Sequence, residues 1–140
     1  MRIWHTFLIE ALPREQLVSQ WREISSIVGA IQKNGTPNHI LVNFVMDYDY
    51  DHLISYAYYV REEMKKRGYR TMDSVWNKIV SLKPNWNLLL TIYHCFKEKM
   101  NDEYFEICYW NLREKWLCGG ITNQDWQKID DEYTSYTTRF

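Results

Sequence analysis

Apolar side chains recur along this chain at intervals of three and four residues, and this spacing limits its possible folds more than any other feature. Two stretches show the spacing most clearly: Leu17, Trp21, Ile24 and Val28, and then Leu53, Ala57, Val60 and Met64. Because an α-helix turns once every 3.6 residues, each set lies along one face of a helix. No long strand-like alternation occurs. We therefore predict an all-α fold, a compact single helical domain over residues 1–140 with three to five helices.

Prolines, glycines and charged residues indicate where the first two helices begin and end. Pro13 suits the first position of a helix over residues 13–28, and Gly29 is expected to weaken or end that helix. The second helix should end at Gly68, because glycine is favoured just after a helix. The basic run at residues 65–67 supports this end, since cations are favoured in the last turn of a helix.

The remaining segments give weaker signals. Residues 34–37 predict a turn, and the apolar run over residues 39–46 fits either a buried extended segment or a helical turn. Residues 71–86 are expected to be irregular, with a break at Pro84. Three further helices are predicted. The first is marked by Leu89, Ile92 and Phe96. The second is marked by Phe105, Cys108 and Leu112 and ends at Gly119 and Gly120, and the third is marked by Trp126, Ile129 and Tyr133 and begins with a capping box of Thr122 and Asp125.

The composition limits the class of protein. With 46% hydrophobic and 25% charged residues, the chain has the balance of an ordinary globular protein rather than a disordered one. It has no apolar stretch of membrane-spanning length and no signal-peptide pattern at its start. Three widely spaced cysteines form no CxxC pair, which argues against a structural zinc site. We predict a cytoplasmic monomer that uses no metal and no cofactor.

Charge is spread unevenly along the chain. The net charge of −1 argues mildly against a nucleic-acid partner. Residues 101–140 carry four Lys or Arg against eight Asp or Glu, so this stretch supplies most of the acid. A positive face elsewhere remains open, because the local field steers a partner more than the total charge does.

The sequence contains no familiar local catalytic signature. A P-loop, GxGxxG, HExxH and GxSxG are all missing, and the four histidines are scattered. On helix geometry alone, Arg22 and Glu23 fall beside the apolar stripe as solvated charges. An isolated Arg-Glu pair is weak evidence for any function.

The order of short motifs along the chain is more informative than any one of them. It resembles that of the pyrimidine-dimer DNA glycosylases, the phage endonuclease V type and its bacterial relatives. The residues that carry the resemblance are Met1-Arg2-Ile3, Leu12, Gln16-Leu17-Val18, Arg22-Glu23 and Gly29 to Lys33, then Met64 to Tyr69 and the stretch Asn111 to Lys115. The resemblance covers residues 1–33 well, residues 50–70 fairly and the rest thinly.

The resemblance implies a DNA repair glycosylase with AP-lyase activity on damaged double-stranded DNA. In that family the N-terminal amine attacks the sugar C1′ and forms a Schiff base, and a glutamate assists. Here these groups would be the Met1 amine and Glu23. An α-amino group has an ordinary pKa of 7.7–8.0, so roughly a tenth to a fifth of such groups is neutral and nucleophilic at pH 7. The implied DNA-binding residues are Arg2, His5, Gln16, Arg22 and Lys33.

Several residues depart from the family pattern. Position 2 is Arg, so the initiator Met1 should be retained, and Gln16 stands where the family has a histidine. The substrate could be a pyrimidine dimer or an abasic site. The alternative function is a non-catalytic module on the same fold that binds nucleic acid or protein, which the acidic last 40 residues favour.

Overall fold

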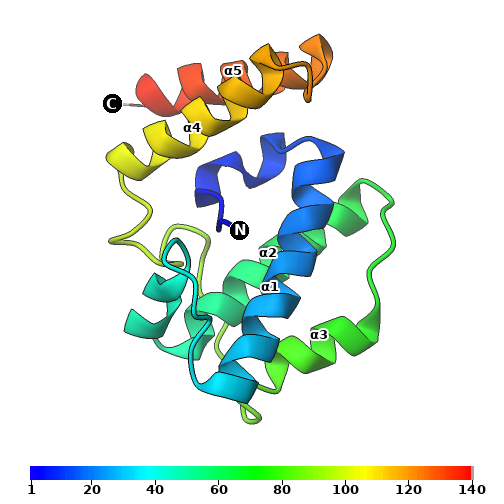
Figure 1. Cartoon of the computed structure of the whole chain (residues 1–140), viewed down its shortest axis with the longest axis vertical. Helices are drawn as coiled ribbons and strands as arrows, with labels where there is room; N and C mark the ends of the chain where they lie inside the picture. The colour runs from blue at the N-terminus through cyan, green and yellow to red at the C-terminus, as the bar shows by residue number, and fades with distance from the viewer. Residues whose placement is uncertain (140) are drawn as a thin grey trace.

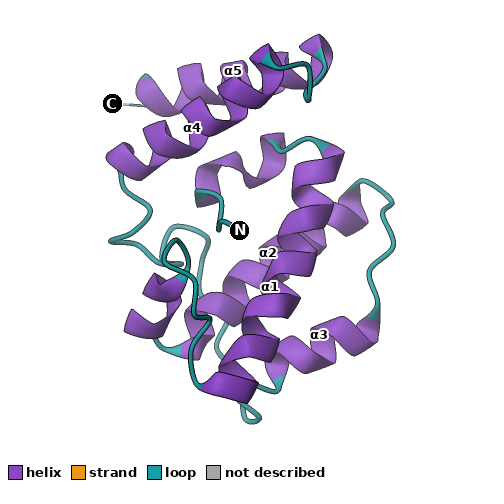
Figure 2. Cartoon of the chain, in the orientation of Figure 1, coloured by secondary structure: helices purple, strands orange, loops and turns teal. Residues whose placement is uncertain are grey.

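The computed structural model describes residues 1–139, and these residues form five α-helices and two 3-10 helices with no strand (Figures 1 and 2). The predicted all-α fold is confirmed. In chain order the elements are η1 (Thr6–Ala11), α1 (Arg14–Asn34), η2 (Asn43–Asp47), α2 (Tyr50–Lys66), α3 (Asp73–Val80), α4 (Asp102–Leu117) and α5 (Asn123–Thr137).

Two groups of helices enclose the N-terminal segment, residues 1–5. Helix α1 packs against α2 and α3, and α4 packs against α5 as a helical hairpin. The 3-10 helix η1 contacts both α2 and α5, so it joins the two groups. Figure 1 shows the N-terminus lying between α1 and the α4–α5 hairpin.

Several predicted helix ends are confirmed. Gly68 has a left-handed backbone with φ +78°, and the following Tyr69 N–H closes α2 by donating to the Met64 carbonyl at 2.8 Å. At the start of α5, Thr122 Oγ1 accepts a hydrogen bond from the Asp125 N–H at 3.1 Å. Both contacts satisfy backbone groups that a helix end would otherwise leave unpaired.

Gly29 was expected to weaken or end the first helix, and the expectation that the helix ends there is wrong. Helix α1 continues to Asn34, and Gly35 with φ +77° provides the left-handed end. A Cβ at Gly29 would lie only 3.1 Å from Lys78 Nζ, which donates to the Ser25 carbonyl at 2.8 Å. Gly29 therefore gives the Lys78 side chain room to join α3 to α1.

Two predictions for residues 71–100 are also wrong. The segment expected to be irregular contains α3, a helix of only eight residues in which Ile79 is the one buried side chain, so its apolar pattern is short. The helix expected around residues 89–96 is instead loop and turns. Side chains of α2 hold this loop, because Leu90 donates its N–H to Ser55 Oγ at 3.0 Å and accepts a hydrogen bond from Tyr59 at 2.7 Å.

Aromatic side chains attach the α4–α5 hairpin to the rest of the molecule. The rings of Phe105 and Tyr136 stack with centroids 3.8 Å apart. His5 and Phe7 meet both rings edge-on, with centroid separations of 4.9–6.1 Å. The hairpin therefore covers the N-terminal segment with its apolar face.

Candidate active site at the N-terminal segment

The backbone of the N-terminal segment is held by Gln20, a fully buried side chain of α1. Gln20 Nε2 donates to the Arg2 carbonyl at 2.9 Å, and Gln20 Oε1 accepts the Trp4 N–H at 2.8 Å. One side chain thus satisfies a donor and an acceptor of a segment that has no helical partners of its own.

Two buried tyrosines hold the same segment from other sides. Tyr56 of α2 donates its hydroxyl to the Trp4 carbonyl at 2.6 Å, and Tyr104 of α4 donates to the Ile3 carbonyl. Burial raises the pKa of both hydroxyls above the ordinary tyrosine value, so both groups stay protonated as donors. Side chains from α1, α2 and α4 therefore meet on residues 2–4.

His5 completes the anchoring of the segment. Its Nδ1 accepts the Phe7 N–H at 3.1 Å at the start of η1, and the ring is only 3% exposed. Burial lowers its pKa to about 4, so the ring is neutral at pH 7. His5 packs against Phe105 and Tyr136 rather than toward Glu23.

A cavity of about 360 Å³ opens beside the anchored segment. Glu23, half-buried on α1, accepts a hydrogen bond from the Arg2 N–H at 3.4 Å through its Oε2. Met1 is 43% exposed and lines the same cavity. The lining residues are Met1, Arg2, Trp4, Glu15, Gln16, Ser19, Glu23, Leu41, Asn111, Glu114 and Lys115.

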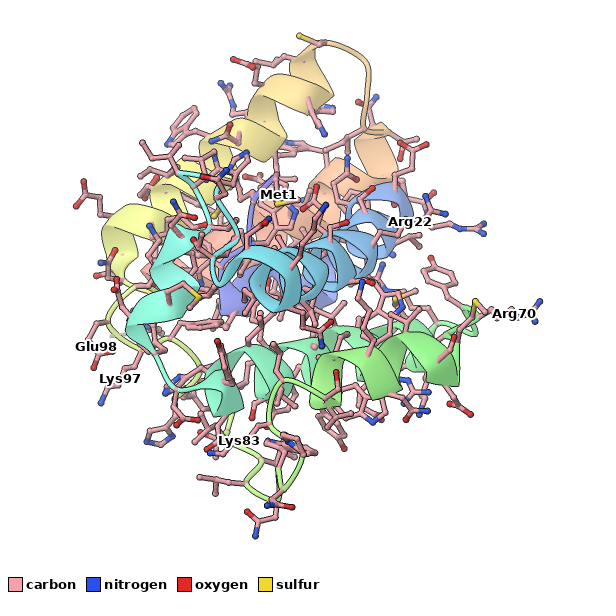
Figure 3. All side chains as sticks on the ribbon, turned by 60° about the horizontal axis from the view of Figure 1, so that its bottom comes forward. Met1, Arg22, Arg70, Lys83, Lys97 and Glu98 are labelled. Carbon is pink, nitrogen blue, oxygen red and sulfur yellow. The ribbon has the colours of Figure 1, made fainter. Side chains whose placement is uncertain are left out.

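The structure brings four of the seven predicted site residues to this cavity: Met1, Arg2, Gln16 and Glu23. Arg22 is exposed on the outer surface of α1, apart from Met1 (Figure 3). Lys33 is exposed ten residues beyond Glu23, about 15 Å along the helix axis. His5 lies in the core and does not line the cavity.

Gln16 has an unused polar atom at the cavity. Its side chain is buried, and its Oε1 has no hydrogen-bond partner among the described residues. A buried carbonyl oxygen without a donor is costly, so this atom lowers the stability of the fold beside the cavity.

Sequence reasoning missed Gln20, Tyr56 and Tyr104. The first had a signal, because Gln20 lies three residues after Leu17 and four before Ile24, on the apolar face of α1. A polar residue at such a position needs an internal partner, which here is the N-terminal segment. The tyrosines had no such signal, since each is one of many aromatic residues at core positions.

Residues 1–139 contain neither a metal-binding cluster nor a membrane-spanning helix. No group of three or more His, Cys, Asp or Glu side chains in this part of the chain is placed to hold a metal ion. No helix there has the length and apolar character needed to cross a membrane.

The fold and the cavity define a helical protein whose N-terminal residue and a glutamate of its first helix share one site. The family model for pyrimidine dimer DNA glycosylase matches residues 1–77, and the chain belongs to this family. Membership identifies a family of DNA repair glycosylases and damaged DNA as its substrate class. No curated protein and no solved structure matches the chain closely enough to count as a relative.

Proposed function

We propose that this protein is a DNA glycosylase with AP-lyase activity on damaged duplex DNA, and that the Met1 amine and Glu23 carry the reaction. The observation that carries this proposal is the hydrogen bond from the Arg2 N–H to Glu23 Oε2 at 3.4 Å. It places a carboxylate one residue from the N-terminal amine, at a cavity that Met1 and Glu23 both line.

The proposed reaction begins when the neutral Met1 amine attacks the sugar C1′ of the damaged nucleotide. A carbon–nitrogen bond forms and the glycosidic bond breaks, and the base takes the bonding electron pair and the proton that the amine loses. In a pyrimidine dimer this base stays joined to its neighbour through the cyclobutane ring. Opening of the sugar ring gives an iminium ion. Glu23 stabilises this positive charge and moves protons between the amine and the sugar oxygen.

The lyase step follows from the same intermediate. Loss of a proton from C2′ sends electrons toward the iminium, and the C3′–oxygen bond breaks to release the 3′ phosphate. Addition of water to the imine then regenerates the Met1 amine. An abasic site enters this sequence at its aldehyde, so the same residues serve both pyrimidine dimers and abasic sites.

The proposed DNA contacts divide by position. Arg2 and Gln16 reach the cavity, whereas Arg22 and Lys33 extend along exposed surface of α1 and would hold phosphates. His5 is enclosed in the core, so its contribution is to position the N-terminal segment rather than to contact DNA.

Trapping of the imine tests the proposal. Protein with a verified free Met1 amine is mixed with borohydride and duplexes that carry a pyrimidine dimer, an abasic site or no lesion. We expect a covalent adduct on Met1 with each damaged duplex and none with the undamaged one. An adduct on a lysine would assign the nucleophile elsewhere. No adduct, with the protein folded and bound to DNA, would favour the non-catalytic module.

Matched variants test the two residues separately. Glu23→Gln should reduce adduct formation at least about a hundredfold while DNA binding persists, because the amide cannot move protons. Glu103→Gln, an exposed carboxylate in the first turn of α4, is the control and should leave adduct formation unchanged. One extra residue before Met1 should abolish the adduct, since it displaces the amine from Glu23. Equal rates for Glu23→Gln and Glu103→Gln would remove Glu23 from the mechanism.

A further inference from the structure

Two large apolar residues project from the loop that follows α1. Ile40 is 89% exposed and the adjacent Leu41 is 45% exposed. Single exposed apolar residues are common on protein surfaces and need no explanation. Here two such residues are adjacent at the tip of a turn, so a function for them depends on which part of the molecule the tip lies beside.

The tip is held in a fixed shape by His39 and Asn43. The His39 N–H donates to Asn43 Oδ1 at 2.9 Å, and the Leu41 N–H donates to His39 Nδ1 at 3.3 Å. The His39 carbonyl accepts the N–H groups of Val42 and Asn43 at 3.0 and 2.9 Å. Val42 is completely buried and fixes the turn to the core. Ile40 is therefore presented by a rigid turn.

The tip lies beside the candidate active site. Leu41 lines the cavity shared by Met1 and Glu23, so Ile40 is one residue from the wall of that cavity. In Figure 1 the loop after α1 rises along the molecule toward the N-terminus. A duplex that covers this cavity would therefore also meet the loop that carries the tip.

The chain that carries the tip is poor in charge. Between Glu23 and Asp47 the chain has no Asp or Glu, and Lys33 is the only Lys or Arg. Such a stretch suits contact with the apolar faces of bases, while the cavity wall beside it carries Arg2 and Lys115 together with Glu15, Glu23 and Glu114.

We propose that Ile40 and Leu41 form a wedge that enters the base stack of duplex DNA beside the lesion. Proteins that kink a duplex often insert Leu, Ile, Phe or Met side chains between base steps, and the side chain fills the space that unstacking leaves. Here the wedge holds the duplex open while the damaged nucleotide reaches the cavity. This inference rests on the proposed function, because it takes damaged duplex DNA as the ligand.

Fluorescence of 2-aminopurine placed next to an abasic site reports unstacking without any chemistry. The measurement uses the Glu23→Gln background, so that the duplex is bound and not cut. Binding should raise the fluorescence, and adding Ile40→Ala should reduce this rise about tenfold, which corresponds to about 1.4 kcal/mol of lost wedge energy. Ile40 is exposed, so its truncation should not disturb the core. Leu88→Ala, at a residue that is 52% exposed on another loop, is the control and should leave the rise unchanged.

The outcomes separate the wedge from the proposed chemistry. A fluorescence rise that is the same with and without the Ile40→Ala substitution overturns the wedge, whether or not the unmodified protein cuts DNA. A rise that depends on Ile40, in a protein that forms no borohydride adduct, supports the wedge and overturns the proposed chemistry. No binding to the damaged duplex overturns both.

Discussion

The tyrosines of the family-matched region, residues 1–77, and those of the α4–α5 hairpin bond to different acceptors. Tyr56 and Tyr59 donate to backbone carbonyls, those of Trp4 and Leu90. Within the hairpin the acceptors are carboxylates: Tyr109 bonds to Asp130, Tyr133 to Glu106 and Tyr136 to Asp102. The matched region thus uses tyrosines to fix irregular backbone, whereas the hairpin uses them to hold its two helices together.

This difference gives a structural reason for some of the acidic residues in the hairpin of this DNA repair glycosylase family member. Three of its carboxylates, on Asp102, Glu106 and Asp130, have a structural use as tyrosine acceptors. Tyr104 is the exception in the hairpin, because it donates to the Ile3 carbonyl and so belongs functionally to the other region. The hairpin supports the site mainly by covering and fixing the N-terminal segment.

Removing the aromatic contact between the regions should have the largest effect. Phe105→Ala leaves a cavity against Tyr136, His5 and Phe7, and should reduce the free energy of unfolding by about 3–5 kcal/mol in urea denaturation. Trp110→Ala on the exposed side of α4 should cost less than about 1 kcal/mol. Equal costs would mean that the hairpin is not anchored through Phe105.

Loss of Gln20 should have the next largest effect. Gln20→Leu keeps the volume but leaves the Arg2 carbonyl and the Trp4 N–H unpaired, which should cost about 2–4 kcal/mol. Borohydride trapping should slow as well, because the segment that carries Met1 loses its fixed position. Gln124→Leu on the exposed start of α5 is the control. A variant that is less stable but is trapped at the normal rate would show that Gln20 stabilises the fold without positioning Met1.

Acid should lower the free energy of unfolding through His5, which packs against Phe105 and Tyr136 of the hairpin. Its folded pKa of about 4 lies below the ordinary value of 6.5, so the unfolded chain takes up a proton first as pH falls. The stability from the neutral ring is complete above pH 6.5 and is lost as pH falls toward 4, by about 2 kcal/mol at pH 5. Urea denaturation at pH 7 and pH 5 should show this extra loss relative to His5→Gln. An identical pH dependence in the variant would contradict it.

The smallest effects are expected from removing single tyrosine hydroxyls, one that donates to a backbone carbonyl and one that donates to a carboxylate. Tyr104→Phe leaves the buried Ile3 carbonyl without a donor and should cost about 1–2 kcal/mol. Tyr136→Phe should cost less than about 0.5 kcal/mol from the lost hydrogen bond, because the Asp102 side chain is 75% exposed and reaches water. Urea denaturation measures both, and the reverse order would contradict the comparison.

The sequence predicted helices well where one face is continuously buried. Helices α1, α2, α4 and α5 have such faces, but α3 has only eight residues with Ile79 alone buried, and Lys78 crossing Gly29 helps to hold it against α1. The helix predicted in the loop at residues 87–100 is wrong for the opposite reason. Cys95 and Phe96 are buried, but side chains of α2, rather than a helical repeat, decide their placement.

The candidate site could be predicted only in part. Ordered motifs pointed to Met1 and Glu23, and the structure places both at one cavity while their roles remain proposals. The parts of the site that come from distant sequence could not be found in this way. Leu41 reaches the cavity from the loop after α1, and neither a periodicity nor a motif at its position indicates a cavity. Lys115 reaches it from α4; it lies in the stretch Asn111 to Lys115 that carries part of the resemblance, but the resemblance gave this stretch no role at the site.

The hydrogen bond between Tyr104 and Ile3 also has a consequence for the timing of folding. It joins residues separated by 101 positions, so the N-terminal segment cannot acquire all its partners until α4 has been made. At synthesis rates of about 5–20 residues per second, that delay is roughly 5–20 s. A contact of this range also predicts slower folding than in helical bundles held by local contacts. During synthesis the N-terminal segment therefore lacks some of the hydrogen bonds that hold it, and the site is completed only after α4 has been made.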